Sequence, residues 1–350
     1  MDLDTLIREA VKSAASDIFI LAGFPASIKV KGELTSLNEE KLLPETTYQI
    51  IEQIYGLANR PMDKLNNTGD DDFSFAVAGV SRFRVSTYKQ RGSLAAVIRI
   101  ISFGIPDYRE INIPDSVMEV AERTKGLVLV TGPAGGGKTT TLACIIDRIN
   151  ETRTGHIITL EEPIEYLHRN KKSVVSQREI ELDSESYLKA LSACLRQAPD
   201  VILVGEMRDF ETIRTAMTAA ETGHLVISTL HTLGAANSID RIVDVFPPNQ
   251  QQQIRIQLAM VLQSIVSQQL VPGIDGRMLP IFEVMHMTPA ARTLVREAKT
   301  HQINALIASS AAEGMLSMDG SLYKLFKEGI IARETAVRYA ITPDALEKRL

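Results

Sequence analysis

The stretch LVLVTGPAGGGKTTTL, residues 127–142, decides the fold class of this chain. It joins a short apolar run to a segment with helical spacing through a turn rich in glycine. Gly132, Gly137, Lys138 and Thr139 occupy the fixed positions of the G-x-x-x-x-G-K-[ST] pattern. Because an apolar strand precedes the pattern and a helix follows it, the stretch predicts a phosphate-binding loop rather than an ordinary turn.

The residue types of this loop suit a nucleotide. Glycines let backbone N–H groups turn towards phosphates, and the start of the following helix adds a favourable field. Lys138 can reach the β- and γ-phosphates, and the Thr139 hydroxyl can ligate Mg²⁺. We therefore expect nucleotide contacts along the whole loop, at Gly132, Pro133, Ala134, Gly135, Gly136, Gly137, Lys138, Thr139 and Thr140.

Apolar runs like the one before the loop recur in the second half of the chain. HIITL at 156–160, VILVG at 201–205 and HLVIST at 224–229 are separated by helical stretches. Continuous apolar strands that alternate with helices are typical of a parallel sheet covered on both faces. We therefore predict an α/β core over residues 115–286. From residue 249 onward the pattern is mostly helical, and residues 287–350 are expected to form a helical C-terminal region.

The residues before this core have a different pattern of apolar and polar residues. Alternation of apolar and polar residues predicts antiparallel strands at 16–23, 26–34, 71–79, 81–92 and 94–101. Turns are expected at Gly32, Gly79 and Gly92, and helical spacing at 5–15 and 44–58 adds two helices. We expect a smaller α+β domain at 1–103 and a hinge linker at 104–114, which contains two prolines and few apolar residues.

Composition narrows the class of protein. The 350 residues are 45% hydrophobic and 23% charged, which indicates a globular protein of two domains. A net charge of −5 argues against nucleic acid as a partner. The two cysteines form no CxxC unit, which favours a reducing compartment over a zinc module. Since no apolar run approaches the roughly 20 residues of a membrane span, we expect a cytoplasmic protein.

Acidic residues follow two of the apolar runs. In VGEMRD, Gly205 stands where such strands often end in an acid that supports magnesium, and Glu206 comes next. Glu206 is therefore the candidate base or water-positioning group. Magnesium support is expected from TLEEPIEY, where Glu161 and Glu165 follow a strand that we expect beside the phosphate loop.

Two histidines flank the apolar run in TGHLVISTLHT, residues 222–232. A metal site, a general base and a structural sensor are the alternatives. Zinc would need about three or four protein ligands, and a base is unnecessary once Glu206 is available. An extended strand would separate His224 from His231 by more than about 20 Å. We therefore predict that His231 senses the γ-phosphate, less surely with Thr229, while His224 is either structural or functional.

Taken together, these motifs resemble those of the secretion-type hexameric ATPases, and within that family the motors that retract type IV pili. The P-loop, EEPIE, VGEMRD and TGHLVISTLHT occur in the family's order and spacing. Similar segments include SDIFILAG near the start, and ARTLVRE and GMLSMDGSL near the end. The resemblance implies a RecA-like P-loop core with a PAS-like N-terminal domain that hydrolyses ATP with Mg²⁺.

The resemblance also implies catalytic roles for two arginines of the first domain. Arg84 and Arg99 match arginines with which related motors clamp nucleotide when the domains close. Positive charge near the γ-phosphate stabilises the transition state, and one P-loop lysine is rarely enough. The alternative is a solvated basic strand face.

A motif near the C-terminus is expected to transmit motion. The Ala-Ile-Arg motif of retraction motors aligns with residues 290–292, where Arg292 is kept. Helical spacing over 289–303 predicts Leu294, Ala298 and Ile303 on one face and Arg292 on another. We expect Arg292→Ala to spare ATP binding and hexamers but to abolish pilus withdrawal.

By resemblance, the partners are copies of the chain in a homohexamer and an inner-membrane platform protein, with pilin moved indirectly. The enzyme would then work at the inner face of the cytoplasmic membrane. Three alternatives stay open: a pilus assembly or type II secretion ATPase, a nucleic-acid translocase on the same core, and an accessory paralogue with little turnover. Scarce aromatic residues, at 5%, leave few stacking platforms for nucleic acid.

Overall fold

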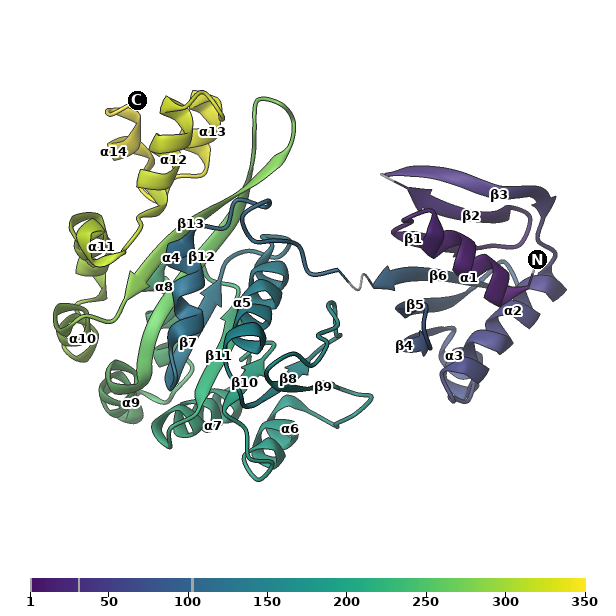
Figure 1. Ribbon diagram of the computed structural model, residues 1–350, viewed down its shortest axis with the longest axis horizontal. Coiled ribbons are helices and arrows are strands. Elements are labelled where there is room, and N and C mark those ends of the chain that lie inside the picture. The colour runs from purple at the N-terminus through teal and green to yellow at the C-terminus, as the bar shows by residue number, and fades with distance from the viewer. Residues whose placement is uncertain (1, 31, 102–103) are drawn as a thin grey trace. The chain divides into compact units, whose positions relative to one another are not determined.

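The computed structural model describes residues 2–30, 32–101 and 104–350. The chain divides into two compact units (Figure 1). The first comprises residues 1–104 and 165–167, and the second comprises 105–164 and 168–350. The domain boundary expected at residue 103 lies outside the described residues. Residues 105–114 are grouped with the second unit, and their role as a hinge stays a prediction.

The first unit is built on an antiparallel sheet of order β3-β2-β1-β6-β5-β4 (Figure 1). Its strands are β1 (Asp17–Ile20), β2 (Pro25–Val30), β3 (Glu33–Lys41), β4 (Asp70–Val77), β5 (Ser81–Gln90) and β6 (Ser93–Ile101). Alternation along β5 buries Phe83 and Val85 and exposes Arg84, as expected for a sheet with one solvated face. Left-handed backbone at Gly32, Gly79 and Gly92 makes the predicted turns.

Helices α1 (Leu3–Lys12), α2 (Pro44–Leu57) and α3 (Asp63–Thr68) complete this unit. In α1 the side chain of Asp2 caps the helix by accepting from Thr5 N. Leu3, Leu6 and Ile7 share the buried stripe of α1, which joins α2 and the sheet in one apolar core. The two predicted helices are confirmed as α1 and α2, and the predicted strands as β1, β2, β4, β5 and β6, although β2 ends at Val30. Strand β3 and helix α3 were not predicted.

The second unit contains the predicted parallel sheet, in the order β13-β12-β7-β11-β10-β8-β9. Neighbours from β12 to β9 run parallel, and β13 pairs with β12 antiparallel. The strands are β7 (Gly126–Thr131), β8 (His156–Glu161), β9 (Val174–Glu179), β10 (Val201–Val204), β11 (Leu225–Leu230), β12 (Leu262–Pro272) and β13 (Met278–His286).

Both faces of this sheet are covered. Along β7, Leu127 and Leu129 belong to one apolar core, and Val128 and Val130 belong to the core on the other face. The second of these cores takes side chains from α4 (Asp115–Met118) and α5 (Lys138–Thr152). The first takes side chains from α6 (Tyr187–Cys194), α7 (Phe210–Glu221), α8 (Ala235–Asp244) and α9 (Pro248–Val261). The α/β fold class predicted from the apolar runs is confirmed.

The expectation of mostly helical structure from residue 249 onward is wrong for part of that stretch. Helix α9 ends at Val261, and the chain passes directly into the β12–β13 hairpin. The hairpin segments are almost continuously buried, and β12 also pairs with β7. Short apolar runs of this kind fit a buried strand or a buried helix equally well by period alone. Residues 262–272 form a strand rather than a helix because they pair with β7, the strand that precedes the P-loop.

Beyond the hairpin the chain is helical, as predicted. The helices are α10 (Pro289–Arg296), α11 (Ile303–Ser309), α12 (Met318–Lys327), α13 (Arg333–Arg338) and α14 (Pro343–Glu347). The last three pack on the hairpin through Val271 and Ile281. Among the residues described, no helix is long and apolar enough to cross a bilayer.

The single helical face expected over 289–303 needs correction. Helix α10 ends at Arg296, and Ala298 takes a positive φ of 57° that breaks the period. Ala298 is therefore exposed, whereas Ala291 and Val295 are the buried residues of α10. Ile303 begins a separate helix, α11, and is buried there.

Candidate active site

The residues predicted for catalysis in the second unit come from strands whose carboxyl ends share one sheet edge. Backbone hydrogen bonds hold these ends in register: Gly132 N donates to Leu230 O at 3.2 Å, and Gly205 N donates to Leu160 O at 2.7 Å. Parallel α/β sheets bind ligands at this edge. The P-loop after β7, Glu161 at the end of β8, Glu206 after β10 and His231 after β11 therefore lie along one edge.

The P-loop runs from the end of β7 to the start of α5, as predicted. Gly137 caps α5 with a left-handed φ of 83°. Lys138 is 8% exposed, and its ammonium donates to Gly132 O at 2.8 Å and to Pro133 O at 2.9 Å. Burial lowers the pKa of Lys138, and the nearby negative charge of Glu206 acts in the opposite direction. The loop therefore holds a desolvated cation with neutral carbonyl partners.

Each carboxylate oxygen of Glu206 has a side-chain partner. Arg208 Nε donates to its Oε2 at 2.7 Å, and His231 Nε2 lies 3.1 Å from its Oε1. The Glu206 side chain is only 16% exposed, whereas that of His231 is 53% exposed. Arg208 and His231 thus orient the Glu206 carboxylate at the same sheet edge from which the P-loop starts.

The two histidines of TGHLVISTLHT lie at opposite ends of β11. His224 Nδ1 is 3.0 Å from Ala219 O and 3.3 Å from Thr222 Oγ1, so it ties the start of the strand to the end of α7. His231 follows the strand and contacts Glu206. Thr229 Oγ1 donates to Gly205 O at 2.6 Å, directly beside Glu206. The structure therefore brings His231 and Thr229 to the proposed catalytic acid and leaves His224 away from it.

The acids expected to support magnesium are not placed as the sequence suggested. Strand β8 does not neighbour β7, because β11 and β10 lie between them. Glu161 is 9% exposed, and its Oε1 accepts from Thr159 Oγ1 at 2.6 Å and from Gln177 Nε2 at 3.1 Å. Glu165 is exposed and is grouped with the first unit. Thr139 is half-buried at the start of α5.

Tyr187 is a site residue that sequence reasoning missed. A Cβ at Gly205 would lie 2.8 Å from its hydroxyl and 3.0 Å from Leu160 O, which explains why β10 is followed by glycine rather than by an acid. Burial raises the pKa of Tyr187, and the carboxylates of Glu162 and Glu206 raise it further. The sequence gave no signal for this role, because Tyr187 is simply the first residue of α6, directly after the N-cap Ser186.

Arg84 and Arg99 lie opposite each other on β5 and β6. Directly opposed residues of an antiparallel pair share one face of the sheet, and both side chains are exposed. Arg99 Nε donates to Asp17 Oδ1 at 3.1 Å, with 69% of its side chain still exposed. The two arginines thus share the solvated face of the first unit's sheet, where the Asp17 carboxylate offsets part of their positive charge.

A pocket of about 340 Å³ opens beside the P-loop within the second unit. Gly137, Thr140 and Thr141 line it from the loop and α5. Its other walls come from the hairpin and from the segment before α4, with Gln268, Leu270, Arg277, Met278, Leu279, Pro280, Glu110, Ile111, Asn112 and Ile113. Apolar walls with a few polar groups are typical of small-molecule sites.

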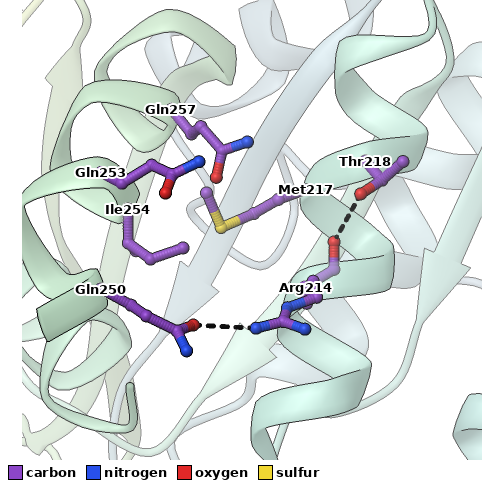
Figure 2. A pocket seen from close by; sticks show the side chains of 7 residues that line it. All are labelled: Arg214, Met217, Thr218, Gln250, Gln253, Ile254 and Gln257. Atoms are coloured by element: carbon purple, nitrogen blue, oxygen red, sulfur yellow. Dashed lines mark hydrogen bonds between the residues drawn. The ribbon is translucent and has the colours of Figure 1, made fainter. Parts of the chain in front are cut away.

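Among the described side chains, no group of three or more His, Cys, Asp and Glu is placed to hold a metal ion. A second pocket of about 210 Å³ lies between α7 and α9, and none of the predicted site residues lines it (Figure 2). There Arg214 donates to Gln250 Oε1 at 2.9 Å. Its guanidinium also lies 4.1 Å from the centre of the Phe210 ring. The hydrogen bond to Gln250 joins the helix that follows Glu206 to α9.

Comparison with known proteins agrees with this geometry. The family of type II/IV secretion system proteins matches residues 1–278. The type IV pilus retraction ATPase PilT of Pseudomonas aeruginosa is 43% identical over 345 residues, which cover 98% of this chain and 99% of that protein. A twitching motility protein of Neisseria gonorrhoeae is 41% identical over 343 residues, covering 98% and 91% respectively. A crystal structure of the pilus retraction motor PilT with bound ADP matches with a TM-score of 0.91 and 45% identity, covering 99% of each chain.

A doubly covered parallel sheet with a P-loop and an oriented glutamate at its carboxyl edge defines a P-loop ATPase. This chain belongs to the family of type II/IV secretion system proteins. Within that family it is similar to pilus retraction motors over almost its entire length, as its motifs predicted.

Proposed function

We propose that this ATPase is a motor that powers type IV pilus retraction. It would act as a homohexamer in the cytoplasm, at the inner face of the membrane, on a platform protein, and would move pilin indirectly. The observation that carries this proposal is the full-length similarity to retraction ATPases, which includes both units and the C-terminal helices.

The P-loop and the adjoining pocket are proposed to bind ATP. The related PilT structure holds ADP, and phosphates would replace Gly132 O and Pro133 O as partners of the Lys138 ammonium. The N–H groups at the start of α5 would point at the same phosphates. The apolar pocket walls beside Thr140 suit a nucleotide base. Glu206 would orient or deprotonate the attacking water, and His231, in contact with it, would transmit the state of the site.

Mg²⁺ would be held in the second unit by the Thr139 hydroxyl, with Glu161 as the acidic candidate of the same unit. Both offer oxygen ligands, which this ion prefers, although two strands separate β8 from β7. Glu165 is grouped with the first unit and would reach the ion only when the units close. Mg²⁺ usually takes only one or two protein carboxylates and fills its other positions with water and phosphates. A site without a group of three acidic or imidazole ligands is therefore adequate. When bound, the ion would neutralise charge on the β- and γ-phosphate oxygens.

Arg84 and Arg99 are proposed to clamp the nucleotide when the two units close around the hinge at 104–114. We expect Arg84→Ala and Arg99→Ala each to lower the kcat of ATP hydrolysis by about 10²-fold, with the Kd for ATP changed less than about tenfold. The reason is that their charges would act in the closed state, after ATP has bound. Steady-state kinetics and calorimetry on purified protein measure the two quantities. Arg8→Ala, an exposed arginine on α1 of the same unit, is the control. Normal kcat in both variants would make the arginine pair a solvated face.

Arg292 has a structural task beside its proposed role in transmission. Its guanidinium donates to Ala259 O and to Met260 O at the C-terminal end of α9, and burial lowers its pKa. Since α9 contacts α7, which follows Glu206, Arg292 joins α10 to the helices behind the catalytic edge.

Arg292→Ala is expected to destabilise the protein by about 1 kcal/mol through loss of this cap, to keep ATPase activity at least in part, and to abolish twitching. Arg292→Lys can still donate to the carbonyls and should regain stability. The exposed Arg296→Ala on the same helix is the matched control. Melting temperature, ATPase rate and motility are measured on each variant. Normal twitching by Arg292→Ala would reduce the residue to its capping role, and loss of hexamers would make it an assembly element.

Deletion of the gene tests retraction against its main alternative. A strain without a retraction motor should keep or accumulate surface pili and lose twitching. A strain without an assembly or secretion ATPase would be bald or defective in secretion. Complementation with wild-type protein and with Glu206→Gln tells whether turnover is required, and an accessory paralogue would complement without measurable turnover.

A further inference from the structure

The P-loop rests on one residue of the neighbouring strand. Gln268, in β12, is 2% exposed. A Cβ at Gly132 would come within 1.9 Å of the Gln268 carbonyl oxygen, and one at Gly137 within 2.8 Å of its Nε2. A Cβ at Gly136 would lie 3.3 Å from the same carbonyl. Glycines of the loop are therefore required not only for turning towards phosphate but also for contact with Gln268 behind it.

A hydrogen bond to α5, the helix that follows the P-loop, fixes the Gln268 side chain. Thr141 Oγ1 donates to Gln268 Oε1 at 2.7 Å, and Thr141 is fully buried on α5. With Oε1 engaged in this way, the other end of the amide, Nε2, lies against Gly137. The amide thus spans from the first turn of α5 to the residue that caps this helix.

Gln268 therefore contacts the part of the loop whose N–H groups would meet phosphate. The N–H groups that bind phosphate belong to the loop and the first turn of α5, and Gly137 adopts a left-handed conformation between them. Thr141 lies three residues after Lys138, so it is on the same turn of α5 as the lysine. A rigid support on both sides of Gly137 lowers the entropy that the loop would lose on binding a nucleotide.

We propose that Gln268 is a positioning residue of the nucleotide site, which holds the P-loop in its phosphate-binding shape through Thr141 and Gly137. The inference rests on the proposed binding of ATP at the P-loop. It predicts an effect on nucleotide affinity rather than on the chemical step, because Gln268 contacts the loop and borders the adjoining pocket, whereas Glu206 follows β10 at the carboxyl edge of the sheet.

Three substitutions separate the parts of this support. Gln268→Leu removes both polar ends of the side chain and keeps its bulk. Thr141→Val removes only the hydroxyl that donates to Oε1. Gln268→Glu keeps an acceptor for Thr141 but replaces the NH₂ beside Gly137 by a negative oxygen near the place where phosphates would bind. The Kd for ADP should rise about tenfold for Gln268→Leu and Thr141→Val, and more for Gln268→Glu. The kcat at saturating ATP should stay within about threefold.

The neighbouring glutamine provides a matched control. Gln269 is 5% exposed on the same strand, and its Nε2 donates to Tyr339 O at 2.8 Å, towards α13. Gln269→Leu removes a buried amide of the same kind and should cost similar stability, yet it should leave the Kd for ADP unchanged. A purely structural role of Gln268 would give equal melting temperatures and equal Kd values for the two leucine variants, and that result would overturn the proposal.

Titration calorimetry with ADP, steady-state ATPase kinetics and thermal melting are run on the full-length variants. If Gln268 acts through Thr141, the double variant with Leu at 268 and Val at 141 should weaken ADP binding no more than the stronger single variant. Additive effects would contradict coupling through Thr141. Should Gln268→Leu fail to fold, Thr141→Val and Gln268→Glu still decide the question. Lys138→Ala tests the underlying nucleotide site. If this variant binds ADP as tightly as the wild-type protein, the proposed function is rejected. If Lys138→Ala binds ADP weakly but the Gln268 variants bind it with normal affinity, only the inference about Gln268 is rejected.

Discussion

Glu206→Gln is expected to lower the kcat of ATP hydrolysis by about 10²–10⁴-fold while it leaves the Kd for ATP within about threefold. Glutamine keeps the size and shape of the side chain but cannot accept a proton from water. Arg208 and His231 hold the native carboxylate by one oxygen each, so an amide oxygen can keep one of these contacts. Phosphate binding would depend on other groups, namely Lys138 and the loop N–H groups. Phosphate release measures kcat, and calorimetry with a slowly hydrolysed analogue measures Kd.

The control for this variant is Glu211→Gln, an exposed glutamate in the first turn of α7 close to the site in sequence. It carries the same change of charge without contact to the catalytic edge. Near-normal turnover by Glu206→Gln would show that another group activates water. Loss of ATP affinity equal to the loss of kcat would instead show that Glu206 serves binding, for instance by stabilising the charged form of Lys138.

The fold was predictable where one physical signal dominated. Apolar runs buried on both faces identified β7, β8, β10 and β11, and glycine turns identified the hairpins of the first unit. The β12–β13 hairpin was not predictable, because LQSIVSQQL continues the apolar spacing of α9 with no glycine or proline between them. Only the long-range pairing of β12 with β7 distinguishes a strand there.

The site was predictable where its residues lie in contiguous motifs. The P-loop, Glu206 and His231 were proposed in this way, and the structure places the last two in contact, as the parallel register of β10 and β11 allows. Tyr187 and Gln268 were missed because each reaches the site from a distant segment, and neither type of side chain marks chemistry by itself. The order of strands was also needed to show that Glu161 is not on a neighbour of β7.

Lys138→Ala is expected to reduce turnover by about 10³-fold or more and to weaken ATP binding by about 10²-fold, since it removes the charge that meets the β- and γ-phosphates. The same change should cost little stability without nucleotide. Burial lowers the pKa of Lys138, which means that the folded state disfavours its ammonium relative to water. A group whose pKa is lowered on folding weakens the folded state at pH values below its ordinary pKa, which for a lysine is 10.5, so the cost is present at neutral pH. Removal of the charge relieves this cost while it also removes the hydrogen bonds to Gly132 O and Pro133 O.

Thermal melting with and without ADP separates the two effects. For the wild-type protein, ADP at about 100 times its Kd should add about 2.7 kcal/mol of stability. Lys138→Ala should melt near the wild-type temperature without ADP and show little increase with it. Lys138→Met, which keeps the length of the side chain, should behave in the same way, because charge rather than bulk binds phosphate. Lys189→Met removes an exposed lysine on α6 and should retain the full increase. A normal ADP response in both Lys138 variants would exclude the P-loop as the phosphate site, whereas a collapse in melting temperature without ADP would show that the ammonium holds the loop together through its carbonyl contacts.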